Sequence, residues 1–361
     1  MSKIFYKNNE LEFDKIKNST SLGNDNFIAS VCKIIADWNS GRKKFKLKTS
    51  GSTAKAKIIF FTKEQLIISA KQTIETFKIS KSDTLFLCLP VDHSAGFMMV
   101  IRALVCKANL LVLKPSKNPL KEISLNQKID FFAFIPQQFS SLILETPEKI
   151  KILNKSRAVI IGGERISKEI IAQAKEIQAP VFHTYGMTET LTHVALKRLN
   201  GKNPDKYFHL LKNIKAETDN KNRLILQTPL YPSKKLYTND IVNLNKDQSF
   251  EWLTRADNII NSSGFKINPD ELAIKIENQI SEIFKNTTYF FFSIPDKIVG
   301  EKLMLAIESS NSEKKEMILK LLTKKLKRYE IPKEIIFIDN FVYSSLGKIN
   351  KIKTIEEAKI K

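Results

Sequence analysis

The chain has 361 residues, 42% of them hydrophobic, and its 59 lysine and arginine residues against 38 acidic ones give a net charge of +21. A chain of this length is too long to fold around one small hydrophobic core, so it predicts two domains. No run of about 18 apolar residues is present, and the first residues lack the apolar stretch of a signal peptide. We therefore expect a cytoplasmic protein without a membrane span.

The positive charge raises the question of nucleic-acid binding. The lysines are spread along the whole chain, and only eight of the 59 basic residues are arginine, the residue that binds bases and phosphates bidentately. We expect no nucleic-acid partner, and a field that favours anionic substrates. Cys32, Cys88 and Cys106 are odd in number, lie in apolar surroundings, and are expected to be reduced core residues.

Between about residues 45 and 230, short apolar runs alternate with helical patterns. The predicted strands are Thr84–Leu89, Leu110–Leu113, Phe131–Ile135 and Ala158–Ile161. Their apolar residues are continuous rather than alternating, which is typical of strands covered on both faces. A helix is predicted over Lys63–Phe77, preceded by the capping-box pair Thr62 and Gln65. The alternation predicts an α/β domain with a mostly parallel sheet.

The pattern changes after about residue 253. A polar stretch over residues 254–270 is followed by predicted elements of both kinds and a lysine-rich tail. These are a helix over Pro269–Ile280, strands over Thr288–Ile294, Leu303–Ile307 and Ile335–Ile338, and an amphipathic helix with Ile318, Leu321, Leu322 and Tyr329 on one side. We expect residues 1–254 to form the large α/β domain and residues 255–361 a small, mobile α+β domain.

Two loops carry polar groups suited to ligands. Thr49, Ser50, Gly51, Ser52 and Thr53 are followed by Lys55 and Lys57. Hydroxyls, backbone N–H groups and ammonium groups in one loop can bind phosphate, although an ordinary polar turn has the same composition. The spacing is not that of a Walker loop. His93, in Leu89–Gly96 after a predicted strand, either caps a loop or lines a pocket at the carboxyl end of the sheet.

Three further segments lie in or directly after apolar runs of β-strand type. Gly162, Gly163 and Glu164 end one strand, and Tyr185, Gly186, Thr188 and Glu189 follow another. A ring, a glycine, a hydroxyl and a carboxylate suit base stacking, phosphate binding and Mg²⁺ ligation, but a strand-to-loop turn with a core tyrosine remains the alternative. Asp240, in an apolar run, either accepts ribose hydroxyls or ends a strand.

In this order, these segments resemble the adenylate-forming superfamily of acyl-CoA synthetases, luciferases and adenylation domains. The resemblance covers nearly everything after residue 45. Tyr185–Glu189 matches the superfamily motif fully, while Thr238–Asp240, Arg255–Asp257, Ser263–Glu271 and Leu346–Ile349 match further motifs. The phosphate loop matches except that Ala54 replaces Gly and Ala56 replaces Pro. Ala54 disfavours a positive φ, so this loop is expected to turn differently.

Within the superfamily, the chain is most similar to the compact 2-succinylbenzoate–CoA ligases of menaquinone synthesis. The stretches that carry this likeness are Asp92–Gly96 with Arg102, Ile135–Gln138, Met187–His193 and Thr238–Val242. The 48 residues before the phosphate loop agree with a trimmed first subdomain. The acid pocket implied by the resemblance is lined by His93, Arg102, Gln138, Thr190, Thr192 and His193. Arg102 could equally pair within the core.

The resemblance implies an enzyme that uses ATP, Mg²⁺ and coenzyme A to activate a carboxylic acid. The resemblance implies that Thr49–Thr53 and Lys57 hold the β- and γ-phosphates, Thr188 the α-phosphate and Glu189 the metal. Tyr185 and Gly162–Glu164 would bind adenine, Asp240 and Arg255 would hold ribose, and Gly186 is also implied to bind the cofactor. Lys348 and His93 are implied to be catalytic, Gly264 and Lys266 to face the coenzyme A channel, and Asp257 to be the hinge.

Other interpretations remain open. The chain could activate another aryl or fatty acid, or load a carrier protein. It could also be a nucleotide-binding regulator without catalysis, although such a protein needs neither Lys348 nor Glu189. The sequence leaves the oligomeric state open, a homodimer included.

Overall fold

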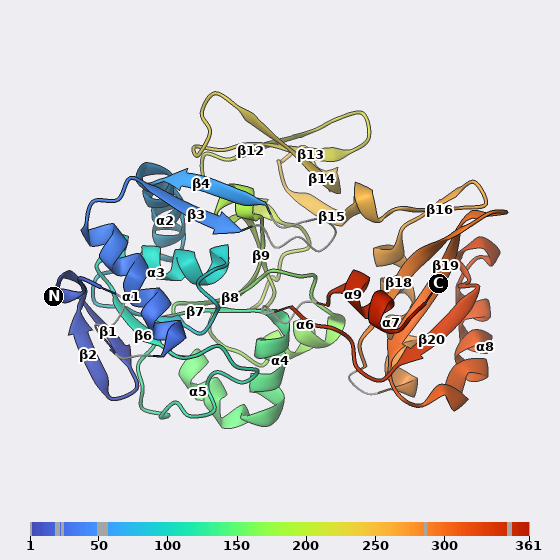
Figure 1. The fold of residues 1–361 in the computed structure, drawn as a ribbon, viewed down its shortest axis with the longest axis horizontal. Coiled ribbons are helices and arrows are strands. Elements are labelled where there is room, and N and C mark those ends of the chain that lie inside the picture. The colour runs from blue at the N-terminus through green and yellow to red at the C-terminus, as the bar shows by residue number, and fades with distance from the viewer. Residues whose placement is uncertain are drawn as a thin grey trace.

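The computed structural model of the chain describes residues 2–18, 22, 25–48, 57–284, 287–344 and 349–360. Figure 1 shows a large body of sheets and helices formed by the N-terminal part and a smaller body formed by the C-terminal part. The predicted phosphate loop Thr49–Thr53 and the predicted catalytic Lys348 lie outside the described residues.

A nine-stranded sheet runs through the large body in the described part of the chain. Its strands are, in order across the sheet, β11 (His209–Leu210), β10 (His193–Arg198), β9 (Val181–Gly186), β8 (Ala158–Ile161), β7 (Phe131–Phe134), β5 (Thr84–Leu87), β6 (Asn109–Val112), β1 (Lys3–Tyr6) and β2 (Asn9–Glu12). The strands from β9 to β1 are parallel, and only the edges are antiparallel.

Helices cover both faces of this sheet (Figure 1). On one side lie α1 (Asn26–Asn39), α2 (Lys63–Phe77) and α3 (Ser94–Cys106), and on the other lie α4 (Pro136–Glu145), α5 (Ile150–Leu153) and α6 (Lys168–Ala174). Double coverage explains why β7 and β8 are buried along their whole length. The predicted α/β class is therefore confirmed. Of the four predicted strands, Ala158–Ile161 matches β8 at both ends, and the other three are present with ends that differ by at most two residues.

The local prediction for α2 is also confirmed. The helix spans Lys63–Phe77, and the Thr62 backbone N–H donates to Gln65 Oε1 at 2.9 Å while the Gln65 N–H donates to Thr62 Oγ1 at 3.3 Å. Cys32 and Cys88 are buried and Cys106 is half-buried, all as free thiols. Burial raises the pKa of Cys32 to about 11, so this thiol stays protonated.

Two smaller sheets complete the large body. One is an antiparallel sheet of β12 (Lys215–Thr218), β13 (Arg223–Gln227), β14 (Lys235–Leu244) and β15 (Phe250–Arg255). The other is a two-stranded ribbon of β3 (Lys44–Lys48) and β4 (Ile58–Thr62), which packs one face on a cluster that contains residues of α2 and α3.

In the described residues, the C-terminal body contains a further sheet and three α-helices. Its strands are β16 (Ile260–Ser262), β17 (Phe265–Ile267), β18 (Tyr289–Asp296), β19 (Gly300–Glu308) and β20 (Glu334–Ile338), and its helices are α7 (Pro269–Ile283), α8 (Lys315–Lys325) and α9 (Lys351–Glu357). The β16–β17 hairpin occupies the stretch read as polar loop, and α9 occupies the predicted tail. Tyr329 lies in a 3-10 turn after α8 rather than on that helix.

The apolar clusters follow the same division. The main cluster includes residues up to Trp252, and the cluster around α7 and α8 begins at Ile260. This agrees with the expected boundary between residues 254 and 255, which we keep as a proposal. The two bodies touch through polar contacts: the Lys168 N–H at the start of α6 donates to Glu277 Oε1 at 2.8 Å, and Arg165 Nη1 donates to the Asp270 carbonyl at 2.8 Å.

An ion pair between a buried aspartate and a more exposed arginine links the segments that lead into two parallel strands. Asp83, 1% exposed, precedes β5 and accepts from Arg157 Nε at 2.6 Å and Nη2 at 3.0 Å, beside the start of β8. Burial alone would raise the pKa of Asp83, but the hydrogen bonds from Arg157 and from the Ser80 N–H outweigh it and hold the pKa below its usual value. The pair therefore stabilises the fold above about pH 4 and loses this contribution as the pH falls.

We expect Arg157→Ala to destabilise the large body by about 2–3 kcal/mol, since a buried carboxylate is left without its cation. Thermal unfolding at pH 7 should then begin about 5–10 °C lower. Without Arg157, burial raises the pKa of Asp83, so the gap between variant and wild type should narrow toward pH 4.5. Arg223→Ala, which breaks a pair with Asp219, a carboxylate that is 19% exposed where that of Asp83 is 1% exposed, is the control and should change Tm less. A gap that widens at low pH would contradict this account.

Candidate functional site

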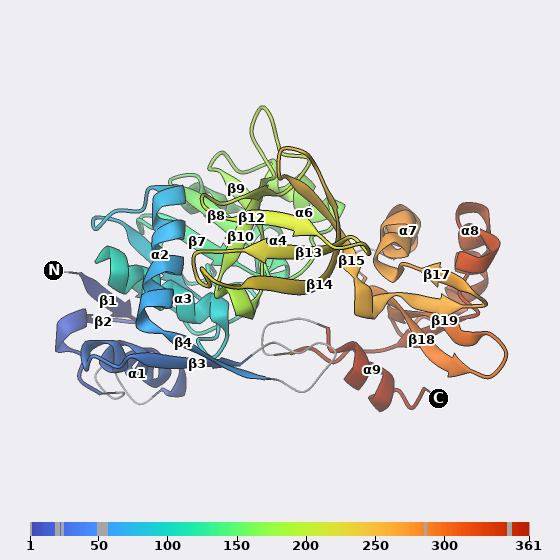
Figure 2. The same cartoon turned by 90° about the horizontal axis from the view of Figure 1, so that it is seen from above.

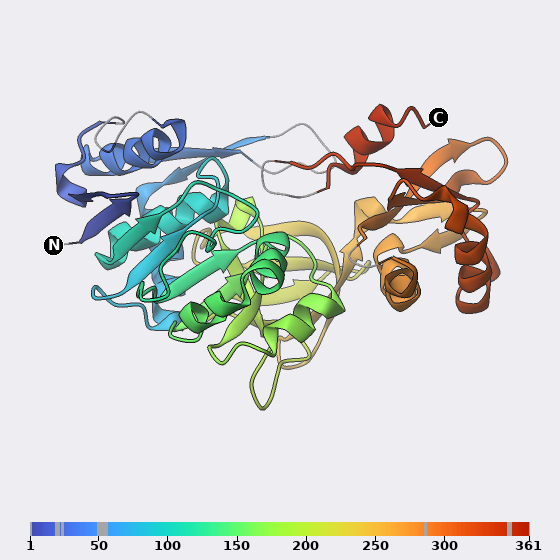
Figure 3. The same cartoon turned by 90° about the horizontal axis from the view of Figure 1, so that it is seen from below.

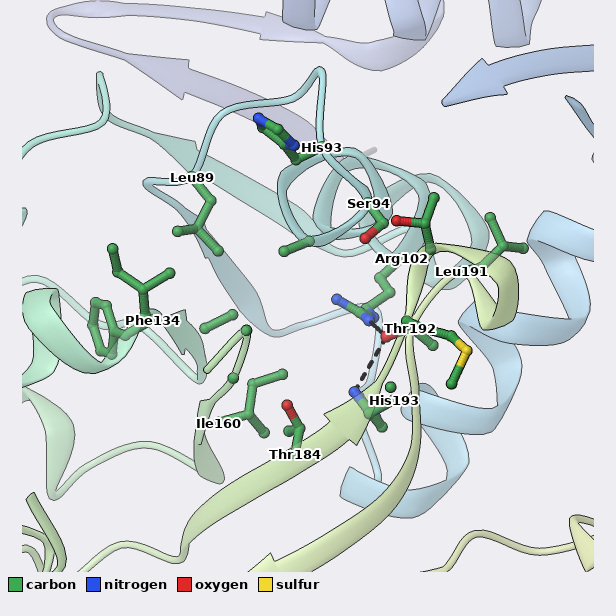
Figure 4. Close-up of a pocket in the computed structure, with 18 residues that line it drawn as sticks. Leu89, His93, Ser94, Arg102, Phe134, Ile160, Thr184, Leu191, Thr192 and His193 are labelled. Carbon is green, nitrogen blue, oxygen red and sulfur yellow. Dashed lines mark hydrogen bonds between the residues drawn. The ribbon is translucent and has the colours of Figure 1, made fainter. Parts of the chain in front are cut away.

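A pocket opens where the central parallel strands end. Leu89 follows β5, Phe134 ends β7, Gly162 follows β8 and Gly186 ends β9, and all four line the pocket together with residues from the start of α3. Figure 4 shows these side chains converging on one space. Because carboxyl ends of parallel strands meet at one edge of the sheet, this is where open α/β folds bind ligands.

Arg102 provides a buried positive charge in this pocket. The side chain comes from α3, is 2% exposed, and donates through Nη2 to Thr192 Oγ1, as the dashed line in Figure 4 shows. Within the described residues its Nε has no hydrogen-bond partner and it makes no salt bridge with a carboxylate. Burial lowers the pKa of Arg102 to about 9, which is still above neutral pH, so the guanidinium keeps its charge. The hydrogen-bond partner of this buried guanidinium is therefore a hydroxyl and not an acid.

His193 lies next to this arginine and is neutral. Its Nδ1 is 3.2 Å from Thr192 Oγ1 and its Nε2 is 3.3 Å from Thr73 Oγ1 on α2. Burial, reinforced by the charge of Arg102, lowers the pKa of His193 well below its ordinary value. The arrangement therefore places one cation, one hydroxyl and one neutral imidazole at the end of a mostly apolar pocket.

Glycines at two strand ends keep the backbone close to neighbouring groups. A Cβ on Gly162 would lie 2.2 Å from Thr184 Oγ1, and one on Gly186 would lie 2.4 Å from the Thr192 carbonyl oxygen. Neither space admits a methyl group, so these glycines fix how closely β8, β9 and the Thr192 segment approach. Gly163, with φ of +95°, turns the chain out of β8 beside the pocket.

Three of the predicted nucleotide residues, Tyr185, Asp240 and Arg255, form a second cluster outside this lining. Asp240 on β14 is 6% exposed and accepts from Tyr185 Oη at 2.6 Å and from Trp252 Nε1 at 3.0 Å. Burial, and then the Asp240 carboxylate, raise the pKa of Tyr185 well above its usual value, so the phenol stays protonated and donates. The Tyr185 ring packs edge-on against Phe250 in the core. This contact corresponds to the alternative interpretation, in which Tyr185 is a core tyrosine.

Arg255 and the predicted hinge Asp257 lie at the end of β15. Arg255 donates to both Asp257 oxygens at 2.9 and 2.8 Å, and its Nη1 is 3.9 Å from Asp240 Oδ1. The Arg255 hydrogen bonds outweigh burial and keep the pKa of Asp257 low. The structure therefore brings Tyr185, Asp240, Arg255 and Asp257 into one group, in which hydrogen bonds join Tyr185 to Asp240 and Arg255 to Asp257 and a 3.9 Å ion pair joins Asp240 to Arg255.

The predicted phosphate and metal residues lie in a 3-10 turn after β9. Thr188 begins this turn, is 8% exposed and lines the pocket. Glu189 follows it, and its carbonyl accepts from Tyr231 Oη at 2.9 Å. Among the described residues no group of three or more metal-ligating side chains exists. One half-buried carboxylate fits Mg²⁺, which usually takes one or two protein carboxylates together with substrate phosphates.

The structure gives two predicted substrate residues other contacts. Gln138 Nε2 donates to the carbonyls of Cys88 at 3.1 Å and Ser116 at 3.0 Å, while its Oε1 caps the start of α4. Thr190 Oγ1 bonds to backbone groups of Met187 and Thr192. Neither residue lines the pocket. Both side chains hold the loops around the pocket instead, because their polar atoms are already satisfied.

The remaining predicted residues are divided between the pocket and the surface. His93 and Thr192 line the pocket with Arg102 and His193. The exposed residues Lys57, Glu164, Gly264 and Lys266 do not. Gly264 has φ of +79° in the turn between β16 and β17.

Sequence reasoning missed the apolar lining and two hydroxyls, those of Ser94 and Thr184. Ile160 and Phe134 come from buried strands, Leu191 from the loop before β10, and Thr184 from the middle of β9. The continuous apolar runs gave no signal that separated a lining residue from a core residue. For Thr184, the position two residues before a strand-end glycine is the one signal that could have indicated a place in the pocket lining.

Comparison with known proteins identifies the family. The sequence profile of the AMP-binding enzyme family matches residues 47–214. A 2-succinylbenzoate–CoA ligase of Lactococcus lactis is 26% identical over 97% of this chain and 78% of its own length. A 2-succinylbenzoate–CoA ligase of Staphylococcus aureus is 22% identical over 84% of this chain, and the match spans 65% of that relative.

Solved structures agree with this assignment. The o-succinylbenzoate–coenzyme A synthetase of Bacillus subtilis, solved with ATP and magnesium, has a TM-score of 0.71 over 86% of this chain and 69% of its own at 17% identity, which shows the shared fold. An AMP-forming acyl-CoA synthetase/AMP-acid ligase II-like protein from Dyadobacter fermentans is 30% identical over 94% of this chain and 96% of its own, with a TM-score of 0.60. The chain therefore belongs to the AMP-binding enzyme family, the AMP-forming acid–thiol ligases that use ATP, Mg²⁺ and coenzyme A.

Proposed function

We propose that this enzyme joins 2-succinylbenzoate to coenzyme A through an acyl-adenylate. The observation that carries the substrate is Arg102, a buried guanidinium without a carboxylate partner at the end of an apolar pocket. A buried charge without a counter-ion is costly, so the site favours a ligand that brings an anion. 2-Succinylbenzoate has two carboxylates: one is activated, and the other can pair with Arg102.

The rest of the pocket suits the uncharged part of such an acid. Leu89, Phe134, Ile135, Ile160 and Leu191 offer apolar contacts to an aromatic ring. Thr192 Oγ1 and the neutral His193 add hydrogen-bonding groups beside Arg102 without adding a second charge. The relatives named 2-succinylbenzoate–CoA ligases support the same substrate.

The chemistry of the first half-reaction follows from charge. A substrate carboxylate oxygen attacks the α-phosphorus of ATP and pyrophosphate leaves, so two anions must approach each other. Cations and dipoles fixed in advance lower that barrier. We assign Thr188 to the α-phosphate, Glu189 to Mg²⁺, Thr49–Thr53 and Lys57 to the outer phosphates, and Lys348 to the charge that develops between carboxylate and phosphorus. Bound Mg²⁺ would neutralise the phosphate oxygens.

In the second half-reaction the coenzyme A thiol attacks the acyl carbon and AMP leaves. We propose that the C-terminal domain turns about Asp257 between the two steps. The contacts that Arg165 and Lys168 make with α7 are few and polar, as expected for a boundary that opens. The turn would withdraw Lys348 and present the loop that carries Gly264 and Lys266.

Arg102→Met should lower the activity with 2-succinylbenzoate more than the activity with acids that have one carboxylate. Methionine fills a similar space without charge, and apolar replacements of buried ions are commonly tolerated by the fold. We expect kcat/KM for 2-succinylbenzoate to fall at least about tenfold, since a charged hydrogen-bond set contributes about 1.5–3 kcal/mol. The rate with benzoate should change little.

Arg198→Met, at a site where the guanidinium donates to the Asn200 carbonyl away from the pocket, is the matched control. The measurement is pyrophosphate release with each acid. Equal losses for both acids, or a wild-type enzyme that prefers benzoate or a medium-chain fatty acid, would remove the 2-succinylbenzoate assignment and leave the adenylating activity in place.

Lys348→Ala should block only the first step. Loss of one preorganised charge at the transition state typically slows a reaction about 10²–10³-fold. ATP–pyrophosphate exchange should fall by that factor, while conversion of synthetic acyl-adenylate to thioester should persist. Lys353→Ala, an exposed lysine five residues further on, is the control. If both half-reactions fall together, Lys348 does not have the proposed role.

A further inference from the structure

The ribbon of β3 and β4 belongs to the most basic stretch of the chain. Between Asp37 and Glu64 there is no acidic residue, while eight basic residues occur: Arg42, Lys43, Lys44, Lys46, Lys48, Lys55, Lys57 and Lys63. Lysines occur throughout the chain, but here they are uninterrupted by carboxylates. The local excess of positive charge is therefore stronger than the average composition indicates.

Strand register sorts this stretch into two different faces. Phe45 pairs with Phe61 and Leu47 with Ile59, and this face packs into the core with α2 and α3. On the other face Lys44, Lys46 and Lys48 alternate along β3 and lie opposite Thr62, Phe60 and Ile58. Opposite residues in an antiparallel pair share one face, so three ammonium groups lie beside two large apolar side chains.

These apolar side chains are open to solvent although the ribbon has a core to pack on. Phe60 is 65% exposed and Ile58 is 55% exposed. In the described part of the chain, no carboxylate forms a salt bridge with Lys44, Lys46 or Lys48. Figures 2 and 3 both place the ribbon along the outer edge of the molecule beside α1, where another surface can approach it.

We propose that this outer face of β3–β4 docks on the surface of an anionic lipid bilayer. Lysine ammonium groups attract acidic headgroups, and a Phe and an Ile between them can enter the headgroup boundary. No helix within the described residues is long and apolar enough to cross a membrane, so the association would be peripheral.

The charge and composition of this face argue against a second copy of the chain, a nucleic acid or a small anion as its partner. A second copy would bring the same row of lysines, and each chain carries a net charge of +21. A single strand of nucleic acid would need a series of stacking rings, whereas this face offers one. A small anion such as ATP would leave Phe60 and Ile58 without a partner. This proposal does not depend on the identity of the acid substrate.

The test is co-sedimentation of the purified full-length protein with vesicles. We expect binding to vesicles of phosphatidylglycerol and phosphatidylcholine at low salt, little binding to pure phosphatidylcholine, and release by 0.5 M NaCl, where the Debye length is only about 4–5 Å. The double variant Lys44→Glu/Lys46→Glu and the variant Phe60→Ser should each bind the acidic vesicles about tenfold more weakly.

Two matched control variants distinguish an effect of the ribbon from an effect of net charge or of exposed apolar side chains elsewhere on the surface. Lys320→Glu/Lys324→Glu changes the net charge equally on exposed positions of α8, and Ile298→Ser removes an apolar side chain that is 94% exposed elsewhere. These controls should bind as wild type does, and circular dichroism should confirm that all variants fold. Absence of binding to acidic vesicles would overturn the proposal. So would equal losses in the α8 double variant, or a wild-type dimer in sedimentation analysis that Phe60→Ser dissociates.

Discussion

The arrangement of the site depends on one constraint: parallel strands that are covered on both faces must all end at the same edge. From β9 to β1 the strands run parallel, so the residues after β5, β7, β8 and β9 meet although the sequence separates them by about a hundred positions. The glycines at 162 and 186 leave no room for a side chain against Thr184 and Thr192. The pocket is therefore a consequence of topology, and its close contacts require glycine.

The sequence predicted those parts of the fold that local physics controls. The capping box of Thr62 and Gln65 defines the start of α2, and uninterrupted apolar residues mark β7 and β8. It failed at β16 and β17, which form a short hairpin from residues that read as polar loop. Ser262 of β16 also pairs with Gly300 of β19, a distant partner that no local pattern reveals. Gln138 shows the same limit for the site, because its amide contacts Cys88 and Ser116 across the fold, and no local pattern reveals that these carbonyls need donors.

Tyr185 shows how one residue can fit two interpretations. It was expected to bind adenine, and its ring packs on Phe250 while its hydroxyl donates to Asp240. A buried carboxylate that is proposed to bind ribose needs partners that hold it in place before the ligand arrives. Tyr185 and Trp252 provide these two hydrogen bonds. A role in orienting Asp240 therefore follows from the contacts themselves, whether or not the ring also touches the base.

The cations of this basic chain differ in their exposure to solvent, and therefore in the roles that we infer for them. Arg102 is almost fully buried, so the free energy of its charge depends on which anion enters the pocket, and the neutral His193 beside it avoids a second unpaired charge. Arg255 lies half-buried between Asp240 and Asp257, so it connects two acidic groups at the junction of the bodies. Lys44, Lys46 and Lys48 are hydrated, and an exposed charge contributes little to stability. The core face of the same ribbon already holds β3 and β4 in place. The regular placement of these lysines beside Phe60 is therefore better explained by the proposed membrane partner than by the stability of the fold.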